Sequence, residues 1–420
     1  MKYVIRGGNK LSGKIRVSGN KNSIFPCVGA ALLTNAEVVL ENMPDIGDTQ
    51  SLIQILKNLG VSAERSGQRL KIKASHIKHV SLPKELMGKL RGSIVLVGAI
   101  LGRVGRIHFY HPGGDVIGQR SIETHLEAFK ILGADLKKKD LKFYLHYKNA
   151  HEEKRDCTIF LPEASVSATE NIILASVLGK RKITIKNCPK EPHVLDLCNM
   201  LSKMGGRITG IGTDTLTIQG VDKLKGTHFK IGIDYVEVGT YIVAAAITGG
   251  KITIKGLDGT DLSPILKQLE RFGISVDVAR GSLSAYAKRL KSIPKLTTNI
   301  WPGFPTDLMS VVIVLATQSK GITLCHDWMY ESRMFFIDKL IAMGARITLA
   351  DPHRVFVWGP ARFKGRRLST PDIRAGMALV LAALSAKGQS VINQAELIER
   401  GYESVVSKLK ELGADIERGS

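Results

Sequence analysis

Charged residues occur at the first positions of several apolar segments that are rich in small residues. Many of these charged residues are Lys or Arg, which suit the binding of an anion. Lys21-Asn22 opens the first such segment, Arg91 the second, Asp307 the fifth and Asp372-Ile373-Arg374 the sixth. Arg400-Gly401-Tyr402-Glu403 precedes the last amphipathic segment. A basic side chain at a helix N-terminus opposes the helix dipole, so its recurrence at equivalent positions indicates anion binding. The alternative, ordinary surface Lys and Arg in a chain that has 60 of them, stays open.

A glycine-rich loop carries a second set of candidate groups. His111-Pro112-Gly113-Gly114-Asp115-Val116-Ile117-Gly118-Gln119-Arg120 leads into an expected helix over residues 121–132. Its three glycines within six positions predict a mobile loop that closes over a ligand. Asp115 has the chemistry of a general acid or base, and Arg120 that of a phosphate partner. A turn aspartate and a solvated arginine remain the alternatives for these two residues.

An internal repeat indicates which elements position these residues. Leu-Gly, Met-Gly or Phe-Gly pairs close helix-like stretches at six glycines: Gly60, Gly133, Gly205, Gly273, Gly344 and Gly413. The intervals between them are 73, 72, 68, 71 and 69 residues. Each period is expected to hold a buried apolar helix, a β-branched strand, an amphipathic helix that the glycine ends, and one further strand. The apolar segments are these: 22–33, 92–101, 167–178, 237–247, 307–317 and 373–384.

Six units divide into two sets of three, which predicts two α/β domains, each with three buried helices inside sheets and outer helices. Counting repeats gives a first domain over 20–232, which carries the loop 111–121, and a second over 233–420. Residues 1–19 read as strand-forming and are expected to join the second domain. The N-termini of the buried helices predict a phosphate-binding cleft between the two domains.

The composition limits the classes of protein to which this chain can belong. The chain has 420 residues, of which 60 are Lys or Arg and 38 are Asp or Glu, so its net charge is +22 and its partners are expected to be anionic. No apolar run is long enough for a membrane span, and the first residues lack a signal-peptide core. Five cysteines without CxxC spacing suit reduced thiols and argue against a zinc site. These features predict a cytoplasmic protein.

Short motifs run through nearly the whole chain. They are these: Gly13, Val17-Ser18-Gly19-Asn20-Lys21-Asn22, Leu90-Arg91, Pro112-Gly113-Gly114, Ile117-Gly118, Arg120, Ser165-Val166, Ala168-Thr169, Glu191-Pro192, Glu237-Val238-Gly239-Thr240, Phe304-Pro305-Thr306-Asp307, Glu331-Ser332-Arg333, Asp372-Ile373-Arg374-Ala375 and Arg400-Gly401-Tyr402-Glu403. Together they resemble the enolpyruvyl transferase family, and within it the branch whose acceptor is UDP-N-acetylglucosamine. The resemblance implies an α/β fold of two inside-out α/β barrel domains, like that of EPSP synthase, each built from three βαβ-type units.

The resemblance also implies a reaction. The enolpyruvyl group of phosphoenolpyruvate moves to the 3-hydroxyl of UDP-N-acetylglucosamine and phosphate leaves, as the first committed step of peptidoglycan synthesis. No metal or organic cofactor is implied, and the partners are the two small-molecule substrates, with no obligate nucleic acid and no membrane. Phosphoenolpyruvate carries a phosphate and a carboxylate, so its site needs several cations.

The family's roles carry over to matching residues. Those implied for catalysis are Lys21, Asp115, Asp307 and Arg400. Those implied for phosphoenolpyruvate are Lys21, Asn22, Arg91, Arg120, Arg374 and Arg400. Those implied for the nucleotide sugar are Asn22, Arg91, Arg120, Ser121, Ile122, Glu123, Thr124, Ser165, Val166, Ser167, Asp307 and Met329. Asp307 matches the base that takes the hydroxyl proton, while Asn22 and Ser165 could also serve as helix N-caps.

The chain departs from the family at the apex of the loop. Most members have Cys there, whereas this chain, like some members, has Asp115. The thiol is the group that the epoxide fosfomycin alkylates, and a carboxylate is a much weaker nucleophile, so we expect Asp115 to act as the acid and fosfomycin not to inactivate the enzyme. Ser167 replaces a usual Gly, Glu163 a common Lys and Glu123 a common Asp. The loss of a cation at position 163 predicts weaker attraction for a diphosphate.

Three alternatives remain at this point. The sister reaction uses shikimate 3-phosphate as the acceptor. A second alternative is a nucleic-acid-binding protein on the same repeat, but the run Lys137-Lys138-Lys139 with Lys142 and Lys148 reads as a solvated strand face or hairpin. The linear sequence shows no interleaving of aromatic and basic residues that would supply stacking platforms. The third is a paralogue that binds the nucleotide sugar without turnover.

Overall fold

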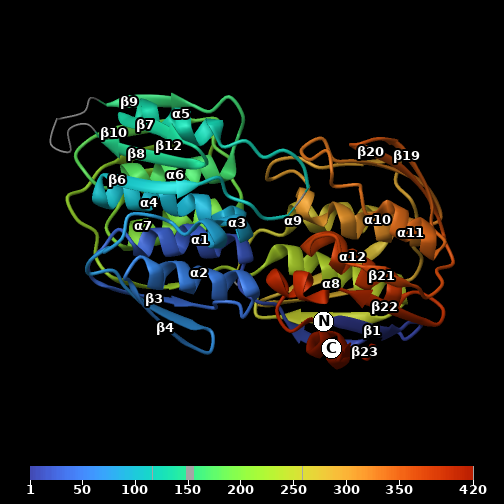
Figure 1. The fold of residues 1–420 in the computed structure, drawn as a ribbon. Coiled ribbons are helices and arrows are strands. Elements are labelled where there is room, and N and C mark those ends of the chain that lie inside the picture. Colours follow the sequence, from blue (N-terminus) through green and yellow to red (C-terminus); the bar gives the residue numbers. More distant parts are fainter. Residues whose placement is uncertain (116, 148–155, 258, 420) are drawn as a thin grey trace. The chain divides into compact units, whose positions relative to one another are not determined.

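Figure 1 shows the chain as a computed structural model, which describes residues 1–115, 117–147, 156–257 and 259–419. The chain forms two compact units. Unit 1 consists of Met1–Ser18, Asp115–Gln119 and Ile233–Ser420, and unit 2 consists of Gly19–Gly114 and Arg120–Gly232. Residue 116 of the predicted loop and Lys148 of the predicted hairpin lie outside the described residues.

The glycine-rich loop is divided differently from the expectation, which placed all of 111–121 in the domain over 20–232. Asp115–Gln119 groups with unit 1. Main-chain hydrogen bonds give the reason: the Gln119 N–H donates to Glu331 Oε1 at 2.7 Å, and the Ser332 N–H donates to the Ile117 carbonyl at 3.0 Å. Hydrogen bonds to chain segments distant in sequence cannot be read from the glycine spacing.

Unit 2 contains three repeats. Its elements are α1 (Lys21–Ala31), β3 (Glu37–Glu41), α2 (Gly47–Asn58), β4 (Ser62–Ser66), β5 (Arg69–Lys73), α3 (Lys84–Lys89), η1 (Arg91–Ile94), α4 (Val95–Val104), β6 (Arg106–Tyr110), α5 (Glu123–Ile131), β7 (Ala134–Lys139), β8 (Lys142–Tyr147), β9 (Cys157–Phe160), α6 (Val166–Ser176), β10 (Lys182–Lys186), α7 (Pro192–Lys203), β11 (Arg207–Thr209), β12 (Thr215–Gln219) and β13 (Thr227–Lys230). Its sheets have the orders β13-β3-β5-β4, β6-β8-β7 and β11-β12-β10-β9.

Unit 1 contains the other three repeats. Its elements are β1 (Lys2–Arg6), β2 (Gly13–Arg16), α8 (Tyr235–Thr248), β14 (Lys251–Lys255), α9 (Ser263–Arg271), β15 (Ile274–Ala279), β16 (Ser282–Ala287), β17 (Lys295–Thr297), η2 (Thr306–Leu308), α10 (Met309–Gln318), β18 (Gly321–His326), α11 (Ile337–Met343), β19 (Arg346–Asp351), β20 (Arg354–Gly359), β21 (Arg367–Ser369), α12 (Ile373–Leu384), β22 (Gln389–Asn393), η3 (Ala395–Arg400), α13 (Val405–Glu411) and β23 (Asp415–Gly419). Its sheets have the orders β21-β22-β1-β23, β15-β16-β14-β2 and β17-β18-β20-β19.

The structure confirms the six-unit repeat and its glycine punctuation. All six glycines have φ between +77° and +112°, the left-handed region in which a side chain is disfavoured: Gly60, Gly133, Gly205, Gly273, Gly344 and Gly413. The six predicted apolar segments correspond to α1, α4, α6, α8, α10 and α12, and each of these helices is almost entirely buried. Separate hydrophobic cores form around the two sets of three helices.

The expectation of one strand after each glycine is wrong for the first five repeats, where an antiparallel pair follows: β4–β5, β7–β8, β11–β12, β15–β16 and β19–β20. The sixth repeat has only β23, because β1 supplies the missing strand and pairs antiparallel with both β22 and β23. β2 pairs parallel with β14. The expectation that the first residues pair with the second half of the chain is therefore confirmed.

Helices α1 and α4 run parallel, and glycines allow them to approach closely. A Cβ at Gly92 would lie 2.5 Å from the Phe25 ring, and a Cβ at Gly29 would lie 3.6 Å from the Ala99 Cβ. The earlier residue on one helix contacts the earlier residue on the other, and the later residue contacts the later one. The N-termini of α1 and α4 therefore lie at one end of unit 2.

Helix α6 follows the same direction as α4. Gly98 lies against Asn171, and a Cβ at Gly102 would lie 2.7 Å from the Leu174 carbonyl oxygen. Any larger residue at either glycine would force the two helices apart. The N-termini of all three buried helices of unit 2 therefore lie at the same end, where the helix dipoles favour an anion.

Candidate functional site

The start of α1 holds the first predicted cation of unit 2. Asn20, and not Asn22, is the N-cap, because its side chain accepts a hydrogen bond of 2.9 Å from the Asn22 N–H. This corrects the suggestion that Asn22 caps the helix. The Lys21 Nζ lies 3.0 Å from Asp48 Oδ2, and the Asp48 side chain is only 4% exposed. A buried carboxylate thus fixes the direction of the Lys21 side chain at the helix start.

Two further predicted cations gather at Gly114. A Cβ at this position would lie 3.0 Å from the Arg91 main-chain nitrogen and 3.2 Å from Arg120 Nη2, and its φ is +110°. The Arg91 Nη2 donates a hydrogen bond of 2.8 Å to the Ser121 carbonyl. Glycine is required here both by the backbone angle and by the two arginines that lie against it.

The stretch from Ser121 to Thr124 opens α5. The Ser121 Oγ accepts a hydrogen bond of 3.0 Å from the Glu123 N–H, so the helix begins two residues later than predicted. Ile122 is 4% exposed and packs in the core, which leaves only its main chain for contact with a nucleotide sugar. Thr124 Oγ1 lies 3.5 Å from Glu163 Oε1, so the acid that replaces the family's usual Lys is directly beside this stretch.

The start of α6 holds Ser165, Val166 and Ser167. Ser165 is the N-cap, as suggested, since its Oγ accepts from the Ala168 N–H at 3.4 Å. The Ser167 Oγ lies 3.1 Å from His125 Nε2, and Asn171 Nδ2 lies 2.8 Å from His125 Nδ1. The Asn171 Oδ1 accepts from the Gly98 N–H at 2.6 Å, which makes its amide nitrogen the donor to Nδ1. His125 therefore carries its proton on Nε2 and donates it to the Ser167 hydroxyl.

Because His125 is buried, we expect a measurable pH dependence of stability. Burial, with a smaller effect from the Arg91 charge, lowers the pKa of His125 to about 3. The unfolded chain binds a proton near pH 6.5 and the folded chain does not, so stability is full above that pH and falls as the pH drops toward 3. At pH 5 the expected loss from this residue is about 2 kcal/mol. Urea unfolding of the wild type and of His125→Gln, whose amide can replace both hydrogen bonds without titrating, measures it. Equal pH profiles for the two proteins would contradict this expectation.

In unit 1 the residues at the starts of α8, α10 and α12 meet. Gly239 of α8 packs on Leu308, one residue before α10. Asp307 lies beside Leu308, and Arg374 of α12 donates from Nη2 to Asp307 Oδ2 at 2.8 Å and from Nε to the same oxygen at 3.2 Å. Arg333 Nη2 donates to Asp307 Oδ1 at 3.3 Å. Two guanidinium groups therefore orient the partly exposed Asp307 carboxylate and compensate its charge.

Arg374 and Arg333 are themselves almost fully buried, at 4% and 3% exposure. Arg374 Nη1 and Arg333 Nε have no hydrogen-bond acceptor among the described residues, although Arg333 Nε lies 3.9 Å from Asp327 Oδ2. Burying a guanidinium donor without an acceptor is costly, so an unpaired donor in such a cluster suits contact with an anionic ligand.

The loop aspartate pairs with the last predicted arginine. Arg400 Nη1 donates to Asp115 Oδ1 at 3.1 Å, and the two side chains are 23% and 20% exposed. Arg400 is the last residue of η3, and the stretch Arg400-Gly401-Tyr402-Glu403 precedes the last helix, α13, as the sequence suggested. Met329, a further predicted contact, follows β18, and its N–H donates to Asp327 Oδ1 at 3.0 Å.

The structure brings Asp115, Asp307, Met329, Arg374 and Arg400 into unit 1 and the other predicted residues into unit 2. Sequence reasoning gave no role to Arg333 and Asp327, although the first belongs to the motif Glu331-Ser332-Arg333. Nothing in the local pattern shows that both side chains are buried. Burial of a charge depends on tertiary packing, so only a structure reveals it.

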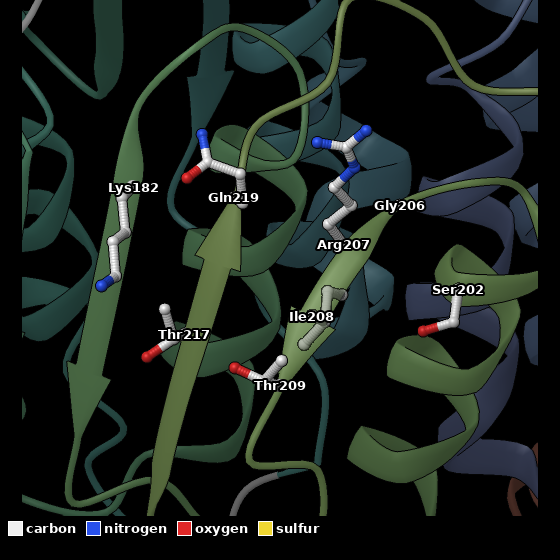
Figure 2. Close-up of a pocket in the computed structure, with 8 residues that line it drawn as sticks. All are labelled: Lys182, Ser202, Gly206, Arg207, Ile208, Thr209, Thr217 and Gln219. Atoms are coloured by element: carbon white, nitrogen blue, oxygen red, sulfur yellow. The ribbon is translucent and has the colours of Figure 1, made fainter.

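A pocket of about 370 Å³ lies away from these residues, between β10, β11, β12 and α7 of unit 2 (Figure 2). Its lining residues are Lys182, Ser202, Gly206, Arg207, Ile208, Thr209, Thr217 and Gln219. It contains none of the predicted site residues, so it supports no part of the expected chemistry.

The lysine run lies in the predicted hairpin, on β7 and β8. The Lys142 Nζ lies 5.7 Å from the centre of the Tyr110 ring and 5.5 Å from that of Tyr144. Lys142 and Tyr144 are two residues apart on β8, and Tyr110 of β6 lies opposite Lys142. Aromatic and basic side chains therefore do lie together here, which corrects the statement that no such interleaving occurs. Within the described residues, three or more His, Cys, Asp or Glu side chains nowhere cluster as metal ligands would. No helix in the same residues is both long and apolar enough to span a membrane.

This fold closely resembles that of the enolpyruvyl transferase NikO from Streptomyces tendae, with a TM-score of 0.88 and 28% identity over 99% of this chain and 98% of that chain. The fold thus defines an enolpyruvyl transferase-like α/β protein. The EPSP synthase (3-phosphoshikimate 1-carboxyvinyltransferase) family matches residues 5–409, and the chain belongs to this family.

The UDP-N-acetylglucosamine 1-carboxyvinyltransferases of Borrelia garinii subsp. bavariensis and Borreliella burgdorferi are each 47% identical to this chain. In both comparisons the match covers 99% of this chain and 98% of the relative.

Proposed function

We propose that this chain transfers the enolpyruvyl group of phosphoenolpyruvate to the 3-hydroxyl of UDP-N-acetylglucosamine and releases phosphate, in peptidoglycan synthesis. The observation that carries the proposal is the full-length similarity to relatives of that name, at 47% identity over 99% of the chain. The sister acceptor, shikimate 3-phosphate, is the alternative that the experiment below tests.

Five cations are the proposed ligands of phosphoenolpyruvate. Lys21, Arg91 and Arg120 lie at or beside the helix starts of unit 2, and Arg374 and Arg400 belong to the cluster in unit 1. The buried Nη1 of Arg374, which lacks an acceptor among the described residues, supports its role as an oxyanion donor. Asn22 would add an amide contact at the start of α1.

Asp307 would act as the base. Its carboxylate is partly exposed and is oriented by Arg374 and Arg333. One carboxylate oxygen can therefore accept the proton of the sugar 3-hydroxyl while the hydroxyl oxygen attacks C2 of phosphoenolpyruvate. The carbon–oxygen bond forms as the double bond opens. The electron pair of the double bond then takes a proton at C3, which gives a methyl group and a tetrahedral intermediate.

Asp115 would deliver the proton to C3. To do so it must carry a proton, and Arg400 Nη1 now donates to its Oδ1. An anionic substrate that draws Arg400 toward itself would release the Asp115 carboxyl group from this ion pair and free it to face C3. Loss of a proton from the methyl group and departure of phosphate then complete the transfer.

The test is phosphate release from phosphoenolpyruvate with UDP-N-acetylglucosamine or with shikimate 3-phosphate. We expect turnover with the nucleotide sugar alone. Turnover with shikimate 3-phosphate alone would transfer the assignment to the sister reaction, and no release with either acceptor would contradict the proposal.

Fosfomycin should distinguish the carboxylate at position 115 from a thiol. We expect preincubation with fosfomycin to leave the wild-type rate unchanged, because the ion-paired carboxylate of Asp115 is a poor nucleophile toward an epoxide. Asp115→Cys should bind the drug covalently and lose its activity with time, which activity assays and mass spectrometry would follow. Covalent labelling of the wild type, at any residue, with loss of activity would refute this expectation.

A further inference from the structure

A buried ion pair in unit 1 joins chain segments that are far apart in sequence. The Lys408 Nζ donates to Glu237 Oε1 at 2.5 Å, and the Ser18 N–H donates to Glu237 Oε2 at 2.5 Å. Lys408 also donates to the Ser18 Oγ at 2.7 Å. The Glu237 side chain is 3% exposed and that of Lys408 is 12% exposed, so the pair is largely removed from water.

The Ser18 hydroxyl also contacts a fourth residue, Glu403. The hydroxyl oxygen accepts from Lys408, and the hydroxyl proton is donated in a short hydrogen bond to Glu403 Oε2. In this series of hydrogen bonds Lys408 is a donor, the Ser18 hydroxyl is both acceptor and donor, and Glu403 is an acceptor. Ser18 is itself 5% exposed.

The segment that receives the contact contains Arg400. It is irregular, because η3 ends at Arg400 and α13 begins only at Val405. Two residues other than glycine with left-handed backbones, Gln394 at φ +55° and Ser404 at φ +53°, bracket it. Such residues persist where the surrounding contacts hold them, so side-chain anchors must determine the path of this segment.

Tyr402 provides the anchor on the other side of the segment. Its hydroxyl lies 3.0 Å from Thr240 Oγ1, and the Arg374 guanidinium lies 5.2 Å from the centre of its ring. Tyr402 is 1% exposed. One short segment therefore carries Arg400, supports Arg374 through Tyr402, and is tied to the buried ion pair through Glu403.

We propose that Ser18 is a positioning residue for Arg400: its hydroxyl links the Lys408–Glu237 ion pair to Glu403 and so fixes the segment 400–403. Its consequence for turnover rests on the proposed function, whereas the positioning itself does not. Ser18 contacts none of the proposed catalytic groups in the described structure, and its effect passes through Glu403.

The test compares Ser18→Ala with Ser390→Ala. Ser390 is also a buried serine of unit 1, and its Oγ accepts from the Arg366 N–H at 3.4 Å, so the chemical change is the same. We expect Ser18→Ala to lower kcat/KM for phosphoenolpyruvate by about 10- to 100-fold, the cost of a misplaced catalytic group. The same variant should speed amide hydrogen exchange in residues 400–404. Ser390→Ala should change neither quantity.

A second variant, Glu403→Ala, removes the acceptor of the same hydrogen bond from the Ser18 hydroxyl. Glu403→Ala should reproduce the effect, and the double variant with Ser18→Ala should be no worse than the poorer single variant, because one contact is lost in all three. If kcat/KM and exchange at 400–404 in Ser18→Ala match those of Ser390→Ala, the proposal is overturned. If the wild type releases no phosphate but exchange at 400–404 rises in Ser18→Ala alone, the proposed function fails and the positioning role stands.

Discussion

Asp307→Asn is expected to lower kcat for phosphate release by about 10²- to 10⁴-fold, the usual contribution of a positioned general base. The amide keeps the shape of the side chain but cannot accept the hydroxyl proton. The oxygens of Asp307 are held by Arg374 at 2.8 Å and by Arg333 at 3.3 Å, so the variant also tests whether charge at this point matters for turnover. Steady-state kinetics with both substrates measure the effect.

The control for this variant is Asp351→Asn, which removes a carboxylate paired with Arg354 at 2.5 Å on the strands β19 and β20 of the same unit. It should retain the wild-type rate. Circular dichroism and urea unfolding establish that both variants are folded. A kcat for Asp307→Asn within tenfold of the wild type would exclude Asp307 as the base.

The repeat was predictable because its signals are local. A left-handed glycine after an amphipathic helix and an apolar segment of about eleven residues are properties of short windows, and both recur six times. In the first repeat the second strand of the hairpin, Arg69–Lys73, was missed because a strand with three cations in five residues does not read as apolar. Its inward residues, Leu70 and Ile72, are fully buried and carry the packing.

The parts of the site that the sequence could not provide depend on long-range contacts. Asp115 and Arg400 are 285 residues apart, and Arg374 and Asp307 are 67 apart, so no window contains either pair. Asn20, two residues before Asn22, is the N-cap because of its backbone angles, which composition does not determine. The contacts of the Ser167 hydroxyl with His125 likewise follow from the packing of α5 against α6.

The two units have the same arrangement of buried helices. Each has polar residues at the starts of three buried, apolar helices. In unit 2 the Lys21 ammonium is paired with the buried Asp48, and in unit 1 Asp115 and Asp307 are each paired with an arginine. These ion pairs fix the directions of the charged side chains within each unit.

Lys408→Met is expected to lower the free energy of unfolding by about 3–5 kcal/mol at pH 8, because it leaves a buried carboxylate without its cation. Burial raises the pKa of Glu237, and the Lys408 charge opposes that rise. Without Lys408 the pKa should rise further, so the folded chain holds a proton at a pH where the unfolded chain has lost it. An acid with a raised pKa contributes stability below its unfolded value, and that contribution is lost as the pH rises through the folded value. The variant should therefore be less impaired at pH 5 than at pH 8, as urea unfolding at the two values would measure.

A second substitution distinguishes the contribution of the Lys408 charge to stability from the contribution of its packing. Adding Glu237→Gln to Lys408→Met removes the uncompensated charge while keeping an acceptor for the Ser18 N–H, which now donates to Glu237 at 2.5 Å. The double variant should recover most of the lost stability, and its remaining deficit relative to the wild type should be nearly the same at pH 5 and pH 8. A loss that is equal at both pH values, and that Glu237→Gln does not relieve, would mean that Lys408 stabilises unit 1 through the packing of its aliphatic stem. Recovery would instead assign the stabilisation to the charge of Lys408, the same charge that holds Ser18 and, through it, Glu403.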